Sequence, residues 1–91
     1  SIARQPSDNI LQRSVAANVA ESITVPSGYR VCLFSSNLNF HANSTTTAAI
    51  GGDVTNGTAS ELNPTAWDVT GVTTISVIAD SAGLIQAIFY K

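Results

Sequence analysis

The sequence predicts an all-β protein, a small β-sandwich or jelly roll of about seven to eight short antiparallel strands with an extended N-terminal arm. Short stretches rich in β-branched and aromatic residues recur along the chain, several alternate apolar and polar positions, and turn residues separate them. No segment is predicted to be a helix. We therefore expect residues 1–13 to form the arm and residues 14–91 to form a single β-sandwich domain.

The arm is predicted because residues 1–13 are polar and irregular, with Pro6 and one apolar pair, Ile10 and Leu11. Such a segment is ordered only where something receives it. It has no apolar run of the kind that a signal peptide carries, and the whole chain has no transmembrane run. We therefore expect a protein that is made in a bacterial cytoplasm and does not enter a membrane.

The first strand is predicted from Val15 to Val25, where apolar residues occupy alternate positions. The spacing of Val15, Val19 and Ile23 also fits a helix, but the β-branched content favours a strand. Glu21 interrupts the inward-facing set, so we expect a bulge or a hairpin near Ala20–Glu21.

A turn at Pro26–Gly28 precedes the next predicted strand, which is apolar on both faces from Val31 to Phe34 and therefore suits the middle of a sheet. Residues 37–43 alternate, which predicts Leu38, Phe40 and Ala42 inward and Asn37, Asn39, His41 and Asn43 outward. A short strand is expected at Trp67–Val69. Residues 73–80 and 84–91 are predicted to form a hairpin around Asp80–Gly83.

The long connection from Asn43 to Ala66 is rich in Gly, Asn and Thr. Its acidic residues do not have EF-hand spacing, although Asp53, Asn56 and Glu61 could form an irregular calcium site. It also lacks the Lys of a phosphate-binding loop. Since connections of this length are usually functional or held by a partner, we interpret it as a surface recognition loop.

Composition excludes several classes of function. Only 11% of the residues are charged, against about 25% in an average domain, and no Lys or Arg occurs between Arg30 and Lys91. Nucleic acid is therefore not expected as a partner. With one His and one Cys, the chain is expected to hold neither a clustered metal site nor a cofactor, and Cys32 has no partner for an internal disulfide. Oligomerisation is the remaining way to reinforce so small a domain.

No enzyme is expected. Cys32 and His41 are the one available pair of nucleophile and base, but Cys32 lies in a strand that is apolar on both faces, as a core residue would. The acidic residues Asp53, Glu61, Asp68 and Asp80 are scattered in predicted loops, so they indicate no catalytic carboxylate pair.

Two surfaces are candidates for binding. Trp67, with Asn63 and Asp68 nearby, could form a stacking platform for a sugar, although a single Trp in a small domain more often closes the core. The two-faced strands Val31–Phe34 and Leu84–Tyr90 carry more apolar surface than one small core needs, which favours a subunit interface.

The runs ESITVPSGYRVCLFSSNLNFHAN (residues 21–43) and SELNPTAWDVTGVTTISVIADSAGLIQAIFY (residues 60–90) resemble small virion proteins of tailed bacteriophages. In these proteins an apolar strand ends in a Pro/Gly turn, a strand pair with aromatic and Asn positions follows, and a variable loop precedes a closing pair of strands. The loop Ser44–Ser60 has no counterpart in this pattern.

The resemblance implies a capsid decoration (cement) protein: a structural β-sandwich on the capsid surface that clamps neighbouring copies of the major capsid protein and often forms a homotrimer. Its interface is expected to include Ile10, Leu11, Arg13, Leu84, Ile88 and Tyr90. The alternative is a carbohydrate- or receptor-binding module of a phage tail or fibre, with Asn63, Trp67 and Asp68 as contacts.

Overall fold

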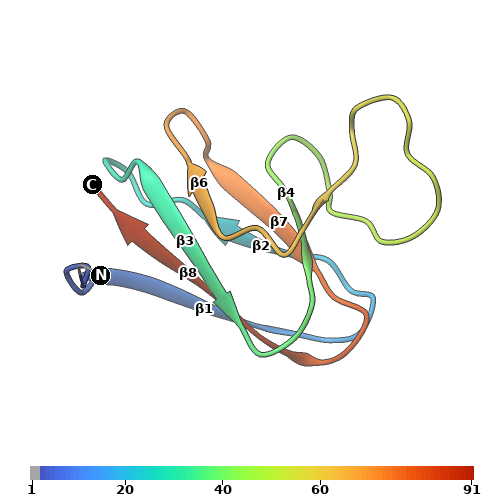
Figure 1. The fold of residues 1–91 in the computed structure, drawn as a ribbon, viewed down its shortest axis with the longest axis horizontal. Coiled ribbons are helices and arrows are strands. Elements are labelled where there is room, and N and C mark those ends of the chain that lie inside the picture. The colour runs from blue at the N-terminus through green and yellow to red at the C-terminus, as the bar shows by residue number, and fades with distance from the viewer. Residues whose placement is uncertain (1–2) are drawn as a thin grey trace.

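The computed structural model describes residues 3–91, which fold into eight β-strands and no helix (Figure 1). The strands are β1 (Asn9–Val15), β2 (Glu21–Thr24), β3 (Val31–Ser36), β4 (His41–Asn43), β5 (Glu61–Leu62), β6 (Ala66–Asp68), β7 (Thr74–Ile78) and β8 (Gly83–Tyr90). The predicted all-β class is therefore confirmed.

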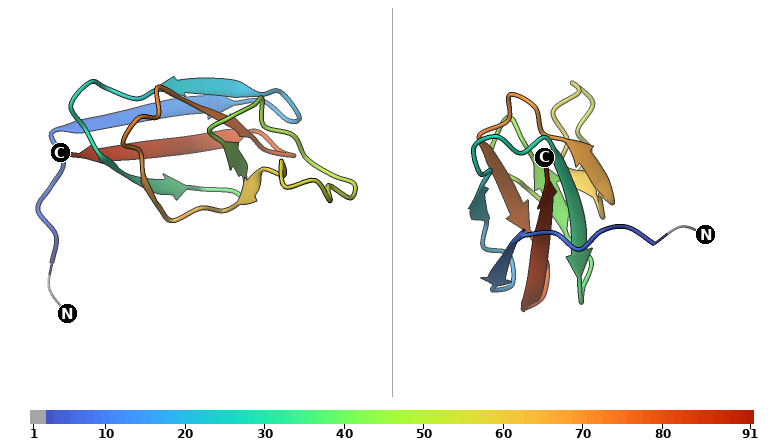
Figure 2. Two further views of the ribbon diagram at one scale, coloured as in Figure 1. Left: turned by 90° about the horizontal axis from the view of Figure 1, so that it is seen from above. Right: turned by 90° about the vertical axis from the view of Figure 1, so that its left-hand side faces the viewer.

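The strands form two antiparallel four-stranded sheets that pack face to face (Figure 2). We name them sheet A, in the order β1-β8-β3-β6, and sheet B, in the order β2-β7-β4-β5. The first strand pairs with the last, the second with the seventh, the third with the sixth and the fourth with the fifth. This nested pairing is the strand order of a jelly roll, in which one long hairpin winds into two sheets.

The core lies between the sheets and explains the alternation in the sequence. Its most buried large side chains are Ile23, Cys32, Val69, Ile75, Val77, Ile85 and Phe89. They come from both sheets, and each fully buried Val, Ile or Phe contributes about 1.5–3 kcal/mol relative to an exposed one. Leu38, Phe40 and Ala42 also face this core, as predicted.

The predicted hairpin around Asp80–Gly83 is wrong. β7 pairs with β2 and β4, whereas β8 pairs with β1 and β3, so this turn carries the chain from sheet B to sheet A. Two alternating strands joined by a short Gly-containing turn look the same in sequence whether they pair or separate. The nested pairing decides between the two arrangements.

The predicted strand from Val15 to Val25 is likewise divided between the sheets. Asn18 adopts a left-handed backbone (φ 62°) and its N–H donates to the carbonyl of Ala79 at 2.7 Å. Val19, expected to face inward, is 48% exposed. The expected break is thus a crossing from β1 to β2, neither a bulge nor a hairpin.

The predicted arm is too long, because β1 already begins at Asn9 and pairs with β8 in register from Asn9↔Phe89 onward. The polar composition suggested that the backbone N–H and C=O groups of residues 9–13 have no partner, but pairing with β8 satisfies them. Residues 3–8 precede the sheet and run past the ends of β8 and β3 (Figure 2). Ser1 and Ile2, the first residues of the predicted arm, lie outside the described residues.

Candidate functional site

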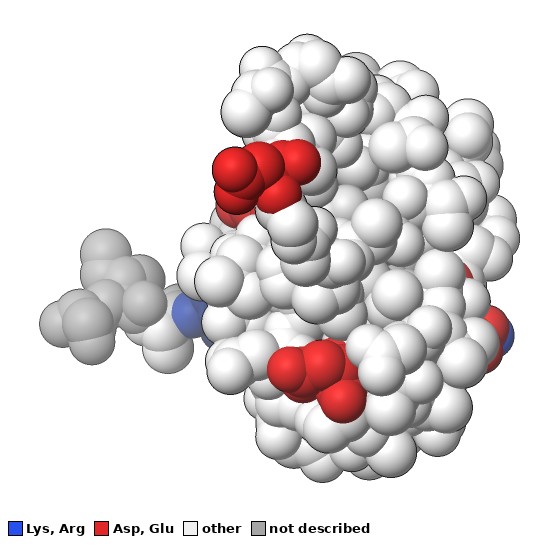
Figure 3. Space-filling model, turned by 90° about the vertical axis from the view of Figure 1, so that its right-hand side faces the viewer, with Lys and Arg blue, Asp and Glu red and all other residues white. Residues whose placement is uncertain are grey.

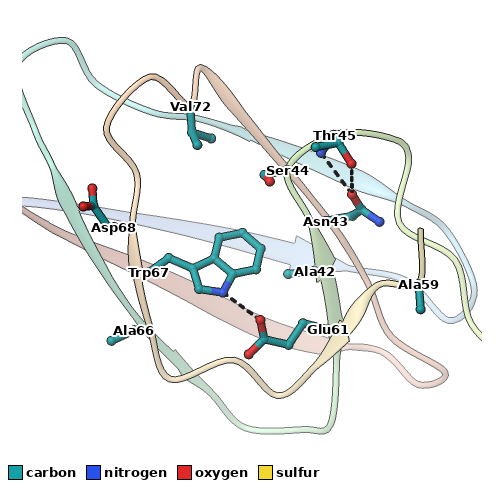
Figure 4. A pocket seen from close by; sticks show the side chains of 10 residues that line it. All are labelled: Ala42, Asn43, Ser44, Thr45, Ala59, Glu61, Ala66, Trp67, Asp68 and Val72. Atoms are coloured by element: carbon teal, nitrogen blue, oxygen red, sulfur yellow. Dashed lines mark hydrogen bonds between the residues drawn. The ribbon is translucent and has the colours of Figure 1, made fainter. Parts of the chain in front are cut away.

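A pocket of about 440 Å³ opens at the side of the sandwich where β4 and β5 of sheet B face β6 of sheet A (Figure 4). We call it the side pocket. Its lining includes Asn43, Ser44, Glu61, Trp67, Asp68 and Val72. Residues that are far apart in the sequence meet here because the nested pairing of the strands places β5 and β6 at the same side.

Trp67 forms one wall of the side pocket. It lies opposite Cys32 in the β3–β6 pair, so its indole ring is on the inner side of sheet A and packs on the core. The ring of Phe34 meets it edge to face, with centroids 5.1 Å apart. Its Nε1–H donates to Glu61 Oε1 at 3.0 Å (Figure 4). The indole is therefore both a partly buried core residue and a fixed wall of a pocket.

Glu61 lies in the side pocket beside the indole. Asp68 follows Trp67 in β6 and borders the pocket, but it lies opposite Val31 of β3, so its side chain points to the outer side of sheet A. The hydroxyl and the backbone N–H of Thr70 hold the pKa of Asp68 below its usual value, and this N–H donates to Oδ1 at 2.9 Å. Asp68 is thus ionised at neutral pH. No Lys, Arg or His is among the described residues that line the pocket. The site therefore favours neutral hydrogen-bond donors or cations over anions.

Asn63, predicted to be a ligand contact, does not line the side pocket. It adopts a left-handed backbone (φ 48°), and its Oδ1 accepts the N–H of Phe40 at 2.9 Å. Its Nδ2 donates to Asn39 Oδ1 at 3.0 Å. Asn63 thus fixes the corner after β5, and Glu61 occupies the place expected for it beside Trp67. The position of Glu61, six residues before Trp67 in the sequence, gave no signal of its contact with the indole.

The loop Ser44–Ser60 connects β4 to β5 and is fastened at its base by Asn43. Contrary to the prediction, Asn43 is buried and 7% exposed. Its Oδ1 accepts the N–H groups of Thr45 (3.0 Å) and Thr46 (3.1 Å), and its Nδ2 donates to the carbonyl of Thr58 at 3.3 Å. The side-chain amide of Asn43 can be buried because the loop supplies its hydrogen-bond partners. The alternation of apolar and polar residues cannot reveal such partners.

The end of the molecule at which the loop lies is largely uncharged, and its acidic side chains form separate patches (Figure 3). Within residues 3–91, no three His, Cys, Asp or Glu side chains are grouped as a metal site would require. Of the three residues considered for calcium, Glu61 bonds Trp67 and Asn56 accepts hydrogen bonds from Thr58. The loop geometry therefore gives no support to a calcium site.

Cys32 and His41 lie in different sheets. Cys32 is fully buried in the core, and this burial raises the pKa of its thiol to about 11. His41 is partly exposed and borders a hollow beneath the long loop, together with Asp53. The thiol is therefore protonated at neutral pH, and the pair has no geometry for nucleophilic catalysis.

The outer face of sheet A carries most of the predicted interface. The register aligns Ile10, Ile88, Leu33 and Ala66 in one row across its four strands and places Tyr90 beside Val31. We name the apolar face as the set Ile10, Val31, Leu33, Leu84, Ile88 and Tyr90. Residues opposite each other in antiparallel strands point to the same side, so Ile10, Leu33 and Ile88 are neighbours, as are Val31 and Tyr90. Leu84 lies opposite Ser14, and a polar row of Gln12, Gln86 and Ser35 separates it from Ile88.

The other two predicted interface residues, Leu11 and Arg13, belong to the opposite face of β1. Leu11 packs against the core, and Arg13 forms an ion pair with Glu21 of β2. Ile10 faces outward, so Leu11 and Arg13 face the core side of β1, because successive residues of a strand point to opposite sides.

In comparisons with known proteins, no family model, no curated protein and no solved structure matches this chain. Residues 3–91 also contain no helix long and apolar enough to cross a membrane.

Proposed function

We propose that the protein is a structural protein of a bacteriophage virion, a capsid decoration protein that binds the capsid surface across neighbouring copies of the major capsid protein. The observation that carries this proposal is the apolar face. It is a second apolar surface on a sandwich whose core lies on the other side of the same sheet.

Exposure supports a binding role for this face. Ile10 is 51% exposed, Leu84 38% and Val31 37%. Scattered apolar residues on a surface need no explanation, but Ile10 and Val31 share one part of the sheet face with Leu33 and Tyr90. Ile88 completes this part but is only 7% exposed, and Leu84 lies apart from it. Contiguous apolar patches of this kind mark contacts with other proteins.

The size of the face supports a clamp with additional contacts. The four strands of sheet A have 7, 8, 6 and 3 residues and lie about 4.8 Å apart, which gives an outer face of roughly 400 Å², of which the apolar face is a part. A stable interface buries about 800 Å² on each partner. The N-terminal segment can supply part of the difference, because Arg4 and Gln5 bond Tyr90 at the edge of the apolar face.

The jelly-roll fold supports the proposal only by analogy, since such folds occur in viral capsid proteins and in lectins alike. Because the chain carries few charges, binding would depend on the burial of apolar surface. Salt would therefore weaken it little.

The test is co-sedimentation with shells assembled from the major capsid protein that the same genome encodes. We expect stoichiometric binding that is lost in the double variant Ile10→Asp/Val31→Asp and weakened when residues 1–6 are deleted. This deletion leaves β1 intact, whereas removal of residues 1–13 would destroy it. Val54→Asp is the matched control, because Val54 is exposed on the long loop. A wild-type chain that stays in the supernatant would refute the proposal.

The proposed homotrimer is tested separately by light scattering after size exclusion. We expect a mass three times that of one chain, reduced to a single chain by Ile10→Asp/Val31→Asp. A wild-type monomer would restrict the proposal to chains that meet only on the shell.

A further inference from the structure

The side pocket is not part of the apolar face and has no task in the proposed clamp. It opens between the sheets, whereas the apolar face is the outer surface of sheet A. We propose that the side pocket binds a neutral saccharide, with the sugar ring against Trp67 and its hydroxyl groups bonding Glu61, Ser44 and Thr45. This inference does not depend on the proposed shell function.

The indole ring of Trp67 is held in a fixed position in which a sugar can stack on it. Trp67 is held by Phe34 on the core side and by Glu61 through its Nε1–H, so binding does not have to order it. Aromatic rings combine a large apolar surface with a polar edge, and pyranose rings present C–H groups on one face and hydroxyl groups around it. A fixed aromatic wall of this kind contributes to affinity because little entropy is lost on binding.

The polar groups of the pocket are suited to hydroxyl donors. Glu61 uses Oε1 for the indole, which leaves its second oxygen available to accept a hydroxyl proton. The hydroxyl groups of Ser44 and Thr45 lie across the pocket from it (Figure 4). Carboxylates accept strong hydrogen bonds from neutral hydroxyls. A few such groups around an apolar wall are the usual composition of small-molecule sites, whose volumes of about 300–1,000 Å³ include this one.

The charges select among ligand classes. Anionic sugars are disfavoured because the Glu61 carboxylate would repel them. A cationic amine could contact the same carboxylate and the indole face. However, Glu61 is exposed, and ion pairs at exposed sites contribute little. Stacking on Trp67 does not depend on charge, so a neutral sugar is favoured.

Trp67 is the one tryptophan of the chain, so its fluorescence reports directly on the pocket. The probes are glucose, galactose, mannose and N-acetylglucosamine, with sialic acid as the anionic probe and choline as the cationic probe. We expect a saturable change with at least one neutral sugar, at a dissociation constant on the order of 1 mM. No saturation by any neutral sugar up to roughly 100 mM would overturn the inference, and so would binding of choline alone.

Variants locate the binding. Isothermal titration calorimetry with the best sugar should show at least a fivefold loss of affinity for Glu61→Gln and complete loss for Trp67→Ala. Asp53→Asn is the matched control, because Asp53 lies on the long loop outside the side pocket. Trp67→Phe retains a stacking ring and decides the case if Trp67→Ala does not fold. Unchanged affinity in the pocket variants would place the sugar elsewhere and overturn the inference. Co-sedimentation with shells should be unaffected by Glu61→Gln, so failure of one proposal is distinguishable from failure of the other.

Discussion

Asn43 shows, at the scale of one residue, how a single buried amide can organise a long connection. Its Oδ1 and Nδ2 together bond groups near both ends of the loop Ser44–Ser60. The loop groups belong to the exposed residues Thr45, Thr46 and Thr58 and to the partly buried Ser60, whereas the Asn43 side chain that binds them is buried. The hydrogen bonds of the Asn43 side chain therefore join the two ends of the loop at its base, as those of a short strand pair would.

Replacing Asn43 by Ala should lower the free energy of unfolding by about 2–3 kcal/mol, since several partly buried hydrogen bonds are lost. Asn56→Ala is the matched control, because Asn56 bonds only Thr58 at an exposed turn and should cost less than about 0.5 kcal/mol. Urea unfolding measures both values. Equal effects of the two substitutions would show that Asn43 is not the anchor.

Cys32 gives the stability of the protein a defined pH dependence. The pKa of the buried thiol is raised from 9.0 to about 11, chiefly by desolvation. Above pH 9 the unfolded chain loses the thiol proton while the folded chain keeps it, so unfolding is increasingly favoured up to about pH 11. The contribution of the neutral thiol is therefore complete below pH 9 and lost as the pH rises through this window.

Urea unfolding of the wild type and of Cys32→Ala at pH 7, 9 and 10.5 measures this effect. We expect the difference in stability between the two proteins to narrow at pH 10.5, since only the wild type carries the thiol. Every other side chain is common to the two proteins, so its contribution cancels in the difference. A difference that is constant with pH would contradict a raised thiol pKa.

At the scale of the elements, edge strand β1 carries a charged side chain on its inner face. Arg13 points toward the gap between the sheets and pairs with Glu21 of β2. Both side chains are partly exposed, so the pair contributes at most about 1 kcal/mol to stability. Inward-pointing charges on edge strands protect against pairing with other chains.

Arg13→Leu should therefore change association more than stability. We expect aggregation during heating at protein concentrations where the wild type stays soluble, with a midpoint of urea unfolding close to the wild-type value. Glu21→Gln, which removes the ion pair but keeps the charge of Arg13, serves as the control and should stay soluble. Light scattering during a thermal ramp measures the outcome, and a soluble Arg13→Leu protein would argue against a protective role.

Gly83 begins β8 where no side chain has room. A Cβ added there would lie 2.1 Å from Leu38 Cδ2 and 2.6 Å from Asn37 Oδ1. Asn37 Oδ1 accepts the N–H of Leu84 at 2.9 Å, so moving it also disturbs the start of the strand. Gly83→Ala should cost about 1–3 kcal/mol in urea unfolding. Ser81→Ala in the same turn is the control, and an equally stable Gly83→Ala protein would contradict the close packing.

Sequence patterns predicted individual elements better than their pairing. Alternation located β4, and apolar runs on both faces located β3 and β8; each of these strands buries one face in the core. Neither pattern could show that the strands on either side of Asp80–Gly83 separate, since local spacing carries no information about distant partners. The same limit applies to the side pocket. Trp67 and Asp68 are adjacent in sequence, but the contact with Glu61 depends on the corner that Asn63 makes between the sheets.

At the scale of the whole molecule, the nested pairing makes the loop Ser44–Ser60 the closed end of one long hairpin. β1 and β8 form the open end, where Asn9 lies opposite Phe89. Every strand pair, β4–β5 included, joins a strand that precedes this loop to a strand that follows it. The strands are therefore held by the sheets and the core, and the continuity of the loop is not what keeps them together.

A circular permutant tests this directly. It begins at Gly52, ends at Gly51 and joins Lys91 to Ser1 through a short Gly/Ser linker. Because every strand and every core residue is retained, we expect the same far-ultraviolet circular dichroism spectrum and a stability within about 2 kcal/mol of the wild type. A second permutant, opened between Asp80 and Ser81, is the comparison. It frees the short turn that sets β7 and β8 in different sheets, so it should lose considerably more stability. An unfolded first permutant would show that the intact loop, and not the nested strands alone, holds the jelly roll together.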